Sequence, residues 1–355
     1  MRILFYISTI RGGGAARVMA NLANGFADGG NEVLFITNFP AEHEYSLNGG
    51  IRRFSLEQSE SRAGAVSKNM KRILALRGLI KRHRPDVCVS FMRENNFRLI
   101  IAAAGLNTKT VVSVRNDPSK EYPDAVSRRL AELLYKRADG TVFQTEDARA
   151  FFSEPVQARS AIIFNQVDDR LFQTKDRVGE YILACGRLSK QKNYPMMLRA
   201  FALVLKKAPD EKLRIYGEGP LMDELRSYAG RLGLEQSVSF EGYCENMADV
   251  YAGAKLLLLS SDYEGIPNTM LEAMASSVPV IATDCPCGGP AMVIKDGVNG
   301  YLSDVGREDM FADRVLLALS NLCELSIGAC KTSQSFRGDV VLKKWNDYIR
   351  AVLRD

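Results

Sequence analysis

Short apolar runs alternate with helical patterns along almost the whole chain of 355 residues. In the first half, helical patterns at 15–28 and 66–83 separate apolar runs. These runs, which we predict to be strands, are Arg2–Ser8, Glu32–Thr37, Asp86–Phe91, Thr110–Val114, Gly140–Phe143 and Ser160–Phe164. Strands that are apolar nearly throughout are typical of a parallel sheet covered on both faces. The alternation therefore predicts an α/β fold with right-handed crossovers.

The same alternation starts again after a polar stretch at 166–179. The predicted strands of the second half are Tyr181–Cys185, Lys212–Tyr216, Val238–Glu241, Lys255–Leu259, Val278–Thr283 and Gly300–Leu302. We therefore expect two Rossmann-like domains, 1–165 and 180–337, joined by a linker at 166–179 and followed by a C-terminal helix at 338–355. Ligands of such sheets bind beyond the carboxyl ends of the strands.

The strongest chemical signal is the segment EGIPNTMLE at 264–272, which follows a predicted strand and opens a helix. Free N–H groups at such a helix start suit a diphosphate. Glu264 and Glu272 would bind hydroxyls on opposite sides of that diphosphate, which is the pattern of a nucleotide-sugar. The residues of this segment that we predict to contact the nucleotide-sugar, the sugar donor, are Gly265, Ile266, Pro267, Asn268, Thr269 and Glu272.

A basic loop at 186–193 follows the strand Tyr181–Cys185 and carries Arg187 and Lys192. These two cations are suited to neutralise a leaving diphosphate. The sequence has no Asp-x-Asp motif, and its seven scattered cysteines and two histidines lack zinc-site spacing. We therefore expect no metal and no cofactor, with the nucleotide-sugar as a substrate.

These motifs resemble the retaining glycosyltransferases of family four, which have the GT-B fold. The matching residues are the two glutamates, Ala273-Met274-Ala275, the run 279–284, Gly288-Gly289-Pro290 and the run 297–301. The resemblance implies two sheets facing a central cleft and a C-terminal helix that crosses back to the N-terminal domain. It also implies that Glu264 contacts the donor sugar, that Glu272 contacts the ribose, and that Arg187 and Lys192 face the diphosphate. Further donor contacts would come from Gly13, Gly14, Gly186, Gly217 and Glu241.

Many relatives place a histidine in the N-terminal domain, facing the donor sugar. The matching stretch here is 113–118, which has no histidine. Either Arg115 or Asn116 takes its place, or the contact is absent.

Positive charge gathers in the N-terminal half. Residues 1–165 contain 24 Lys/Arg and 16 Asp/Glu, whereas 166–355 contain 23 and 26. Eight cations and no acid lie at 62–85, in a helical pattern whose apolar positions, Met70, Ile73, Leu74 and Ile80, we expect to pack on the sheet. A second basic patch comprises Arg128, Arg129, Lys136 and Arg137.

This charge indicates an anionic partner, either a membrane surface or a lipid-linked pyrophosphate. Acceptor-side candidates are Arg17, Lys68, Lys71, Arg72, Arg115 and Asn116. Nucleic acid is disfavoured because no aromatic residues are interleaved with the charges. The first apolar run is too short for a signal peptide, so we expect a cytoplasmic protein, peripheral at the inner face of the plasma membrane.

The sequence as a whole predicts a retaining, metal-independent hexosyl- or N-acetylhexosaminyltransferase that uses a UDP-sugar in surface-polysaccharide or glycan assembly. Two alternatives stay open: a non-catalytic nucleotide-sugar-binding subunit, and a UDP-sugar 2-epimerase on the same fold. A nicotinamide-dependent dehydrogenase is disfavoured, because the glycine turn at 12–14 lacks the GxGxxG spacing.

Overall fold

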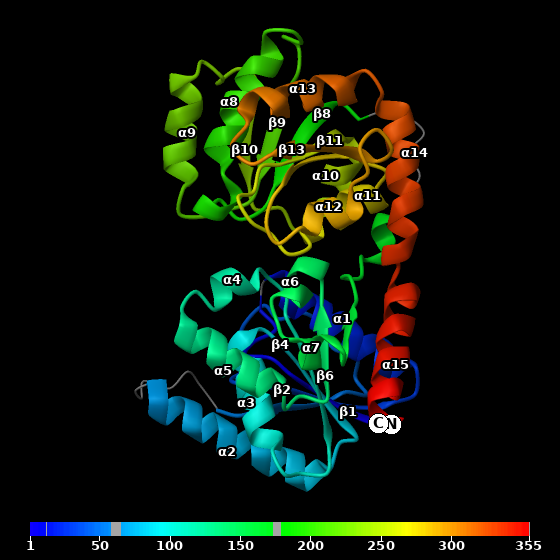
Figure 1. Cartoon of the computed structure of the whole chain (residues 1–355). Helices are drawn as coiled ribbons and strands as arrows, with labels where there is room; N and C mark the ends of the chain where they lie inside the picture. The colour runs from blue at the N-terminus through cyan, green and yellow to red at the C-terminus, as the bar shows by residue number, and fades with distance from the viewer. Residues whose placement is uncertain (12, 58–64, 173–178, 355) are drawn as a thin grey trace. The chain divides into compact units, whose positions relative to one another are not determined.

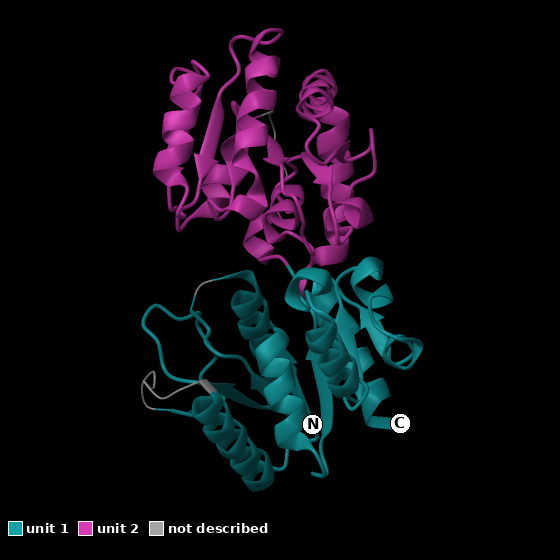
Figure 2. Ribbon diagram, turned by 60° about the vertical axis from the view of Figure 1, so that its left-hand side comes forward, with its two compact units in different colours: residues 1–166, 339–355 teal, residues 167–338 magenta. Residues whose placement is uncertain are grey.

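The computed structural model describes residues 1–11, 13–57, 65–172 and 179–354. Gly12 of the glycine turn, Arg62 of the basic segment and residues 173–178 of the predicted linker lie outside this part. The chain divides into two compact units, residues 1–166 with 339–355, and residues 167–338 (Figures 1 and 2). Each unit holds one parallel sheet with helices on both faces, so the expected α/β class with two Rossmann-like sheets is confirmed.

Unit 1 contains a seven-stranded sheet with the order β3-β2-β1-β4-β5-β6-β7. Its strands are β1 (Arg2–Tyr6), β2 (Glu32–Thr37), β3 (Arg52–Ser55), β4 (Val87–Phe91), β5 (Lys109–Ser113), β6 (Gly140–Phe143) and β7 (Ser160–Ile162). Its helices are α1 (Gly14–Asp28), α2 (Ala65–His83), α3 (Arg93–Ala103), α4 (Pro118–Glu121), α5 (Ala125–Tyr135), α6 (Glu146–Ala150), α7 (Glu154–Gln157) and α15 (Gly338–Arg354).

Edge strand β3 was missed in the sequence. Its residues Arg52, Arg53 and Ser55 are exposed and Phe54 is half-buried, whereas the central strand β1 is buried along almost its whole length. An edge strand covered on few sides needs no continuous apolar run, so the rule that found the other strands does not apply to it.

Both faces of the unit 1 sheet are covered. One face packs against α1 and α15, and Trp345 of α15 is fully buried there against Phe91, with 5.7 Å between ring centroids. On the other face Leu76 and Ile80 of α2 pack beside Leu99 of α3. Helix α3 in turn contacts α5, so α2, α3 and α5 form one layer (Figure 1).

Unit 2 contains a six-stranded sheet with the order β10-β9-β8-β11-β12-β13. Its strands are β8 (Tyr181–Cys185), β9 (Leu213–Tyr216), β10 (Val238–Gly242), β11 (Ala254–Leu259), β12 (Val280–Asp284) and β13 (Gly300–Asp304). Its helices are α8 (Tyr194–Leu205), α9 (Met222–Arg231), α10 (Met247–Gly253), α11 (Asn268–Ala275), α12 (Gly289–Val293), α13 (Glu308–Leu319) and α14 (Leu322–Ser333). Short 3-10 turns lie at η1 (Asp169–Leu171), η2 (Lys190–Lys192) and η3 (Gln334–Phe336).

Candidate active site

Lys192 and Glu264 meet at the carboxyl ends of the unit 2 strands. Lys192 ends the turn η2 after β8, and Glu264 lies in the loop after β11. Lys192 Nζ donates to Glu264 Oε1 at 2.5 Å, and Ser261 Oγ donates to the same oxygen at 3.0 Å. Only 17% of the Lys192 side chain and 11% of the Glu264 side chain are exposed. Two of the three predicted catalytic residues therefore form one largely buried ion pair.

The loop that carries Glu264 is fixed to the loop after β12. The Glu264 N–H donates to the Pro286 carbonyl at 2.6 Å, and the Cys287 N–H donates to the Glu264 carbonyl at 2.9 Å. A Cβ on Gly289 would lie 1.6 Å from the Gly265 carbonyl oxygen, so only glycine fits there. These contacts hold Gly265 and Glu264 in a single backbone arrangement.

The start of α11 has no side-chain cap. Pro267 is the N-cap and makes no side-chain hydrogen bond to the first turn. The first N–H groups of a helix have no partner within the helix, and they form a ready site for an anion. Thr269 Oγ1 is buried and has no hydrogen-bond partner among the described residues. Ile266 and Pro267 are buried, whereas Asn268 and Thr269 are half-buried at the surface of this turn.

Glu272 lies in the second turn of α11 and is 5% exposed. Its Oε2 accepts a hydrogen bond from the Tyr251 hydroxyl at 2.9 Å. Burial raises the pKa of Tyr251 well above its ordinary value, so this hydroxyl stays protonated and acts as a donor. Tyr251 thus orients Glu272 from α10.

Two glycines shape the floor beside the ion pair. Gly186 and Gly217 have φ angles of 143° and 126°, and a Cβ on Gly217 would lie 2.1 Å from the Gly186 carbonyl oxygen. A Cβ on Gly186 would lie 3.5 Å from Lys192 Cε, so backbone, rather than a side chain, borders the Lys192–Glu264 pair.

The other predicted residues of unit 2 lie at the surface. Arg187 is exposed, and no side-chain hydrogen bond or ion pair joins it to another described residue. Glu241 is exposed on the edge strand β10 and accepts a hydrogen bond from Ser239 Oγ at 2.6 Å.

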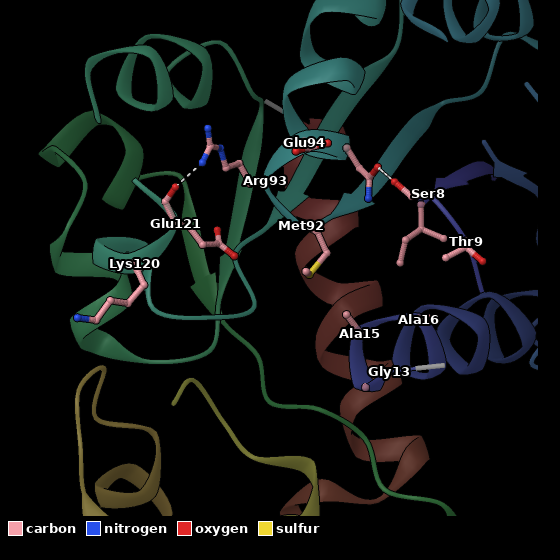
Figure 3. A pocket seen from close by; sticks show the side chains of 13 residues that line it. Ser8, Thr9, Gly13, Ala15, Ala16, Met92, Arg93, Glu94, Lys120 and Glu121 are labelled. Carbon is pink, nitrogen blue, oxygen red and sulfur yellow. Dashed lines mark hydrogen bonds between the residues drawn. The ribbon is translucent and has the colours of Figure 1, made fainter. Parts of the chain in front are cut away.

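Unit 1 contains a cavity of about 580 Å³ at the carboxyl ends of β1 and β4 (Figure 3). The predicted donor residues Gly13 and Gly14 line it. Its other lining residues are Ile7, Ser8, Thr9, Ala15, Ala16, Met92, Arg93, Glu94, Asn95, Lys120 and Glu121. Of the residues that line this cavity, only the two glycines were predicted from the sequence. Arg17, a predicted acceptor-side residue, lies one turn further along α1.

Arg115 and Asn116 do not line this cavity. The Arg115 guanidinium lies over the Phe91 ring, 4.2 Å from its centroid, and Nη2 donates to Asn165 Oδ1 at 2.6 Å. Burial lowers the pKa of Arg115 to about 9. Arg115 is thus bound into the packing of unit 1, and Asn116 beside it is half-buried.

The acceptor-side candidates on α2 differ in their surroundings. Arg72 is buried, and its Nε donates to Glu57 Oε1 at 2.7 Å. Lys71 is exposed and Lys68 is half-buried. The expectation that Met70 and Leu74 pack on the sheet is wrong: they are 56% and 61% exposed, because Leu76 and Ile80 occupy the inner face of the helix.

Two parallel-sheet Rossmann-like units, one of them holding a Lys–Glu pair beside an uncapped helix start, define a glycosyltransferase of the GT-B class. The model of glycosyl transferases group 1 matches residues 179–321, and that of glycosyltransferase family 4 matches residues 12–171. The chain belongs to this family, as its motifs predicted.

Two curated relatives match most of the chain. One is the GalNAc-α-(1→4)-GalNAc-α-(1→3)-diNAcBac-PP-undecaprenol α-1,4-N-acetyl-D-galactosaminyltransferase of Campylobacter jejuni, 29% identical over 90% of this chain and 89% of its own. The other is the amylovoran biosynthesis glycosyltransferase AmsD of Erwinia amylovora, 26% identical over 86% and 89%. Among solved structures, HepE of Anabaena in complex with UDP is similar with a TM-score of 0.82, at 18% identity over 99% of this chain and 100% of its own.

Among the residues that the structure describes, no group of three or more His, Cys, Asp or Glu side chains is placed to hold a metal ion. No single described helix is long and apolar enough to cross a membrane. The segments Glu308–Leu319 and Leu322–Arg354 reach the length and apolar composition of a membrane span only when they are taken together, and they are bent by 96° relative to each other.

Proposed function

We propose that this glycosyltransferase moves a hexose or N-acetylhexosamine from a UDP-sugar to a glycan acceptor and retains the anomeric configuration. The observation that carries the proposal is the Lys192–Glu264 pair beside the open start of α11. A cation and the N-terminal end of a helix suit a diphosphate, and a carboxylate suits sugar hydroxyls. The C. jejuni relative is named for transfer of N-acetyl-D-galactosamine, and HepE was solved with UDP, which supports an N-acetylhexosamine and a UDP donor.

The proposed chemistry is a front-face displacement without a metal ion. The C1–O bond to the diphosphate breaks, and the leaving oxygen keeps both electrons. Lys192, exposed Arg187 and the first N–H groups of α11 stabilise that negative charge. The acceptor hydroxyl bonds to C1 on the same face, and its proton passes to the departing diphosphate. Glu264 orients the donor sugar, and Glu272 binds the ribose.

The acceptor we propose is a glycan on a lipid pyrophosphate. The printed name of the C. jejuni relative describes such an acceptor, a PP-undecaprenol-linked glycan. The protein would then work in surface-polysaccharide or glycan assembly, in the cytoplasm at the inner face of the plasma membrane.

The layer of α2, α3 and α5 supports contact with an anionic membrane. Exposed apolar side chains lie along it: Val66, Met70, Leu74, Ile101, Val126, Leu130 and Leu133. Exposed cations of α2 and α5 accompany them, namely Lys71, Lys81, Arg82, Arg128 and Arg129. Apolar side chains set among cations are typical of surfaces that bind anionic bilayers. Vesicles of phosphatidylglycerol should bind the protein and release it at high salt, whereas vesicles of phosphatidylcholine alone should not bind it.

Release of nucleotide from a panel of UDP- and GDP-sugars, without added metal, tests the proposed reaction. We expect slow hydrolysis of one UDP-sugar by the wild type and its loss in Glu264→Ala. Glu324→Ala, which removes an exposed carboxylate on α14, is the matched control and should retain hydrolysis. Donor binding without turnover, also in the presence of bacterial membrane lipids, would favour the non-catalytic subunit instead.

A further inference from the structure

Within the described part of the chain, Glu264 uses only one of its two carboxylate oxygens for hydrogen bonds. Lys192 Nζ and Ser261 Oγ both donate to Oε1, at 2.5 and 3.0 Å. No described residue donates to Oε2, and this oxygen is not fully enclosed. A carboxylate oxygen can accept more than one hydrogen bond. One oxygen therefore fixes the side chain, while the other keeps its capacity for a ligand.

Ser261 is held in place in the loop between β11 and Glu264. It is buried, and its carbonyl oxygen accepts a hydrogen bond from Thr283 Oγ1 at 2.5 Å. Thr283 is also buried and lies in β12, the strand that pairs with β11. The Ser261 hydroxyl thus reaches Glu264 from a main chain that is anchored to the neighbouring strand of the sheet.

The hydroxyl of Ser261 supplies what the lysine alone does not. The ammonium group of Lys192 ends a flexible four-carbon chain, and a single contact to it leaves the carboxylate free to turn about Oε1. In the proposed reaction this ammonium group also stabilises the departing diphosphate, so its bond to Glu264 changes as the charge develops. The Ser261 hydroxyl has one proton, which it donates to Oε1. Of the two contacts, the one from Ser261 is therefore the one that stays the same throughout the reaction.

We propose that Ser261 is a positioning residue: its hydroxyl holds Oε1 so that Glu264 presents Oε2 to a hydroxyl of the donor sugar. This inference rests on the proposed function, because it takes the sugar of a UDP-sugar to be the ligand of Glu264. Ser261 acts through Glu264 and not on the nucleotide, which is assigned to Lys192, Glu272 and the start of α11. The hydroxyl of Ser261 should therefore contribute to the affinity for the sugar part of the donor and not to the affinity for UDP.

Binding of UDP and of UDP-sugars to the whole protein, measured by isothermal titration calorimetry, tests the proposal. The probes are UDP and its conjugates with glucose, galactose, N-acetylglucosamine and N-acetylgalactosamine, and the variants are compared on the conjugate that the wild type binds most tightly. Ser261→Ala removes the hydroxyl, and Ser261→Cys keeps the size of the side chain with a weaker donor. Ser303→Ala is the matched control, at a buried serine of β13 whose hydroxyl bonds only main-chain oxygens among the described residues.

We expect Ser261→Ala to raise the Kd for the UDP-sugar about tenfold, because a hydrogen bond to a charged group is lost, and to leave the Kd for UDP unchanged. Ser261→Cys should be intermediate, and Ser303→Ala should bind both ligands as the wild type does. Once Glu264→Ala has removed the carboxylate, adding Ser261→Ala should cause no further loss. Equal weakening of both ligands, wild-type affinity in Ser261→Ala, or a further loss in the double variant would overturn the proposal.

Donor hydrolysis separates this inference from the proposed function. If the wild type hydrolyses a UDP-sugar that Ser261→Ala binds with unchanged affinity, the proposed reaction stands and the role of Ser261 is refuted. Binding of a UDP-sugar that depends on Ser261, in a protein that hydrolyses no donor, would support the role of Ser261 and contradict the proposed reaction. A wild type that binds no UDP-sugar would overturn both.

Discussion

Lys192 and Glu264, 72 positions apart in the sequence, are joined by a hydrogen bond of 2.5 Å between Nζ and Oε1. The main chain also ties the two loops together, because the Asp262 N–H donates to the Gln191 carbonyl at 2.8 Å. The carboxylate is thus placed by the cation that we assign to the leaving diphosphate.

Lys192→Ala should lower kcat about 100-fold or more, because an interaction with charge that develops in the transition state is lost. The KM for the donor should change less. Lys190→Ala, at an exposed lysine of the same 3-10 turn, is the control and should retain the rate. Steady-state kinetics would measure both variants, and Lys192→Ala combined with Glu264→Ala should cost less than the sum of the single changes. Simple additivity would contradict the pairing.

Arg72→Ala should destabilise the protein by about 3 kcal/mol or more, because it removes the cation from a largely buried ion pair with Glu57. Arg307→Ala breaks an exposed pair with Asp309 and should leave the free energy of unfolding nearly unchanged. Urea unfolding would compare the two variants. If Arg72→Ala is as stable as the wild type but has a raised KM for the acceptor, the result would instead support the predicted role of Arg72 in acceptor binding.

Gly289→Ala should destabilise unit 2, because its Cβ would overlap the Gly265 carbonyl oxygen. We expect a loss of about 2 kcal/mol or more, in the range of severe overpacking. Gly49→Ala is the control, since no atom lies within 4 Å of a Cβ at that position. Donor binding by Gly289→Ala should weaken as well, because the loop of Glu264 is displaced. An unchanged free energy of unfolding and unchanged donor binding would show that the loop of Glu264 rearranges to make room for the added methyl group.

The free energy of unfolding should depend on pH through Glu121. The pKa of its carboxyl is about 7 in the folded protein against an ordinary value of 4.5, because burial opposes its charge and Asp117 adds to the effect. The folded state therefore binds more protons between these values, and stability falls as the pH rises from about 4.5 to about 7. Glu121→Gln removes this loss, so its advantage over the wild type should be larger at pH 8 than at pH 5. Urea unfolding at both pH values measures the difference, and parallel profiles would contradict the assignment.

Chelation should leave the transfer reaction unchanged, because Arg187, Lys192 and the start of α11 are proposed to supply the positive charge that a metal ion supplies elsewhere. Turnover in millimolar EDTA should equal turnover in buffer. Loss of activity in EDTA, with recovery on addition of Mg²⁺ or Mn²⁺, would show that the diphosphate needs a metal.

The sheets could be predicted because most of their strands are buried on both faces and leave long apolar runs in the sequence. Strand β3 could not, since its edge position tolerates Arg52 and Arg53. Helix α2 was predicted with nearly correct ends, but its inner face only in part: Ile73 and Ile80 pack on the sheet as expected, whereas Met70 and Leu74 are exposed. Helical spacing alone does not decide whether Met70 or Leu76 faces the sheet.

The candidate site was predictable where one short segment carries several groups, as at 264–272. The partners of these groups were not predictable, because Tyr251 and Ser261 reach Glu272 and Glu264 only through the packing of helices and loops. No sequence pattern indicated that the Glu121 carboxyl group is buried either. A glutamate at the end of a four-residue helix resembles a solvated one until the walls around it are known.

Helix α15 has a consequence for how the protein is made. Trp345 fills the interior of unit 1, and Tyr348 Oη accepts from the Thr141 N–H at 2.8 Å and donates to the Arg159 carbonyl at 2.6 Å. Unit 1 is thus made mostly of residues 1–166 but needs helix α15, which follows unit 2 in the sequence, to close its core. During translation the second unit can fold as one continuous stretch, while the first waits with an apolar face uncovered. The unit whose synthesis starts first is therefore completed last, and until then the apolar surface that Trp345 covers stays exposed.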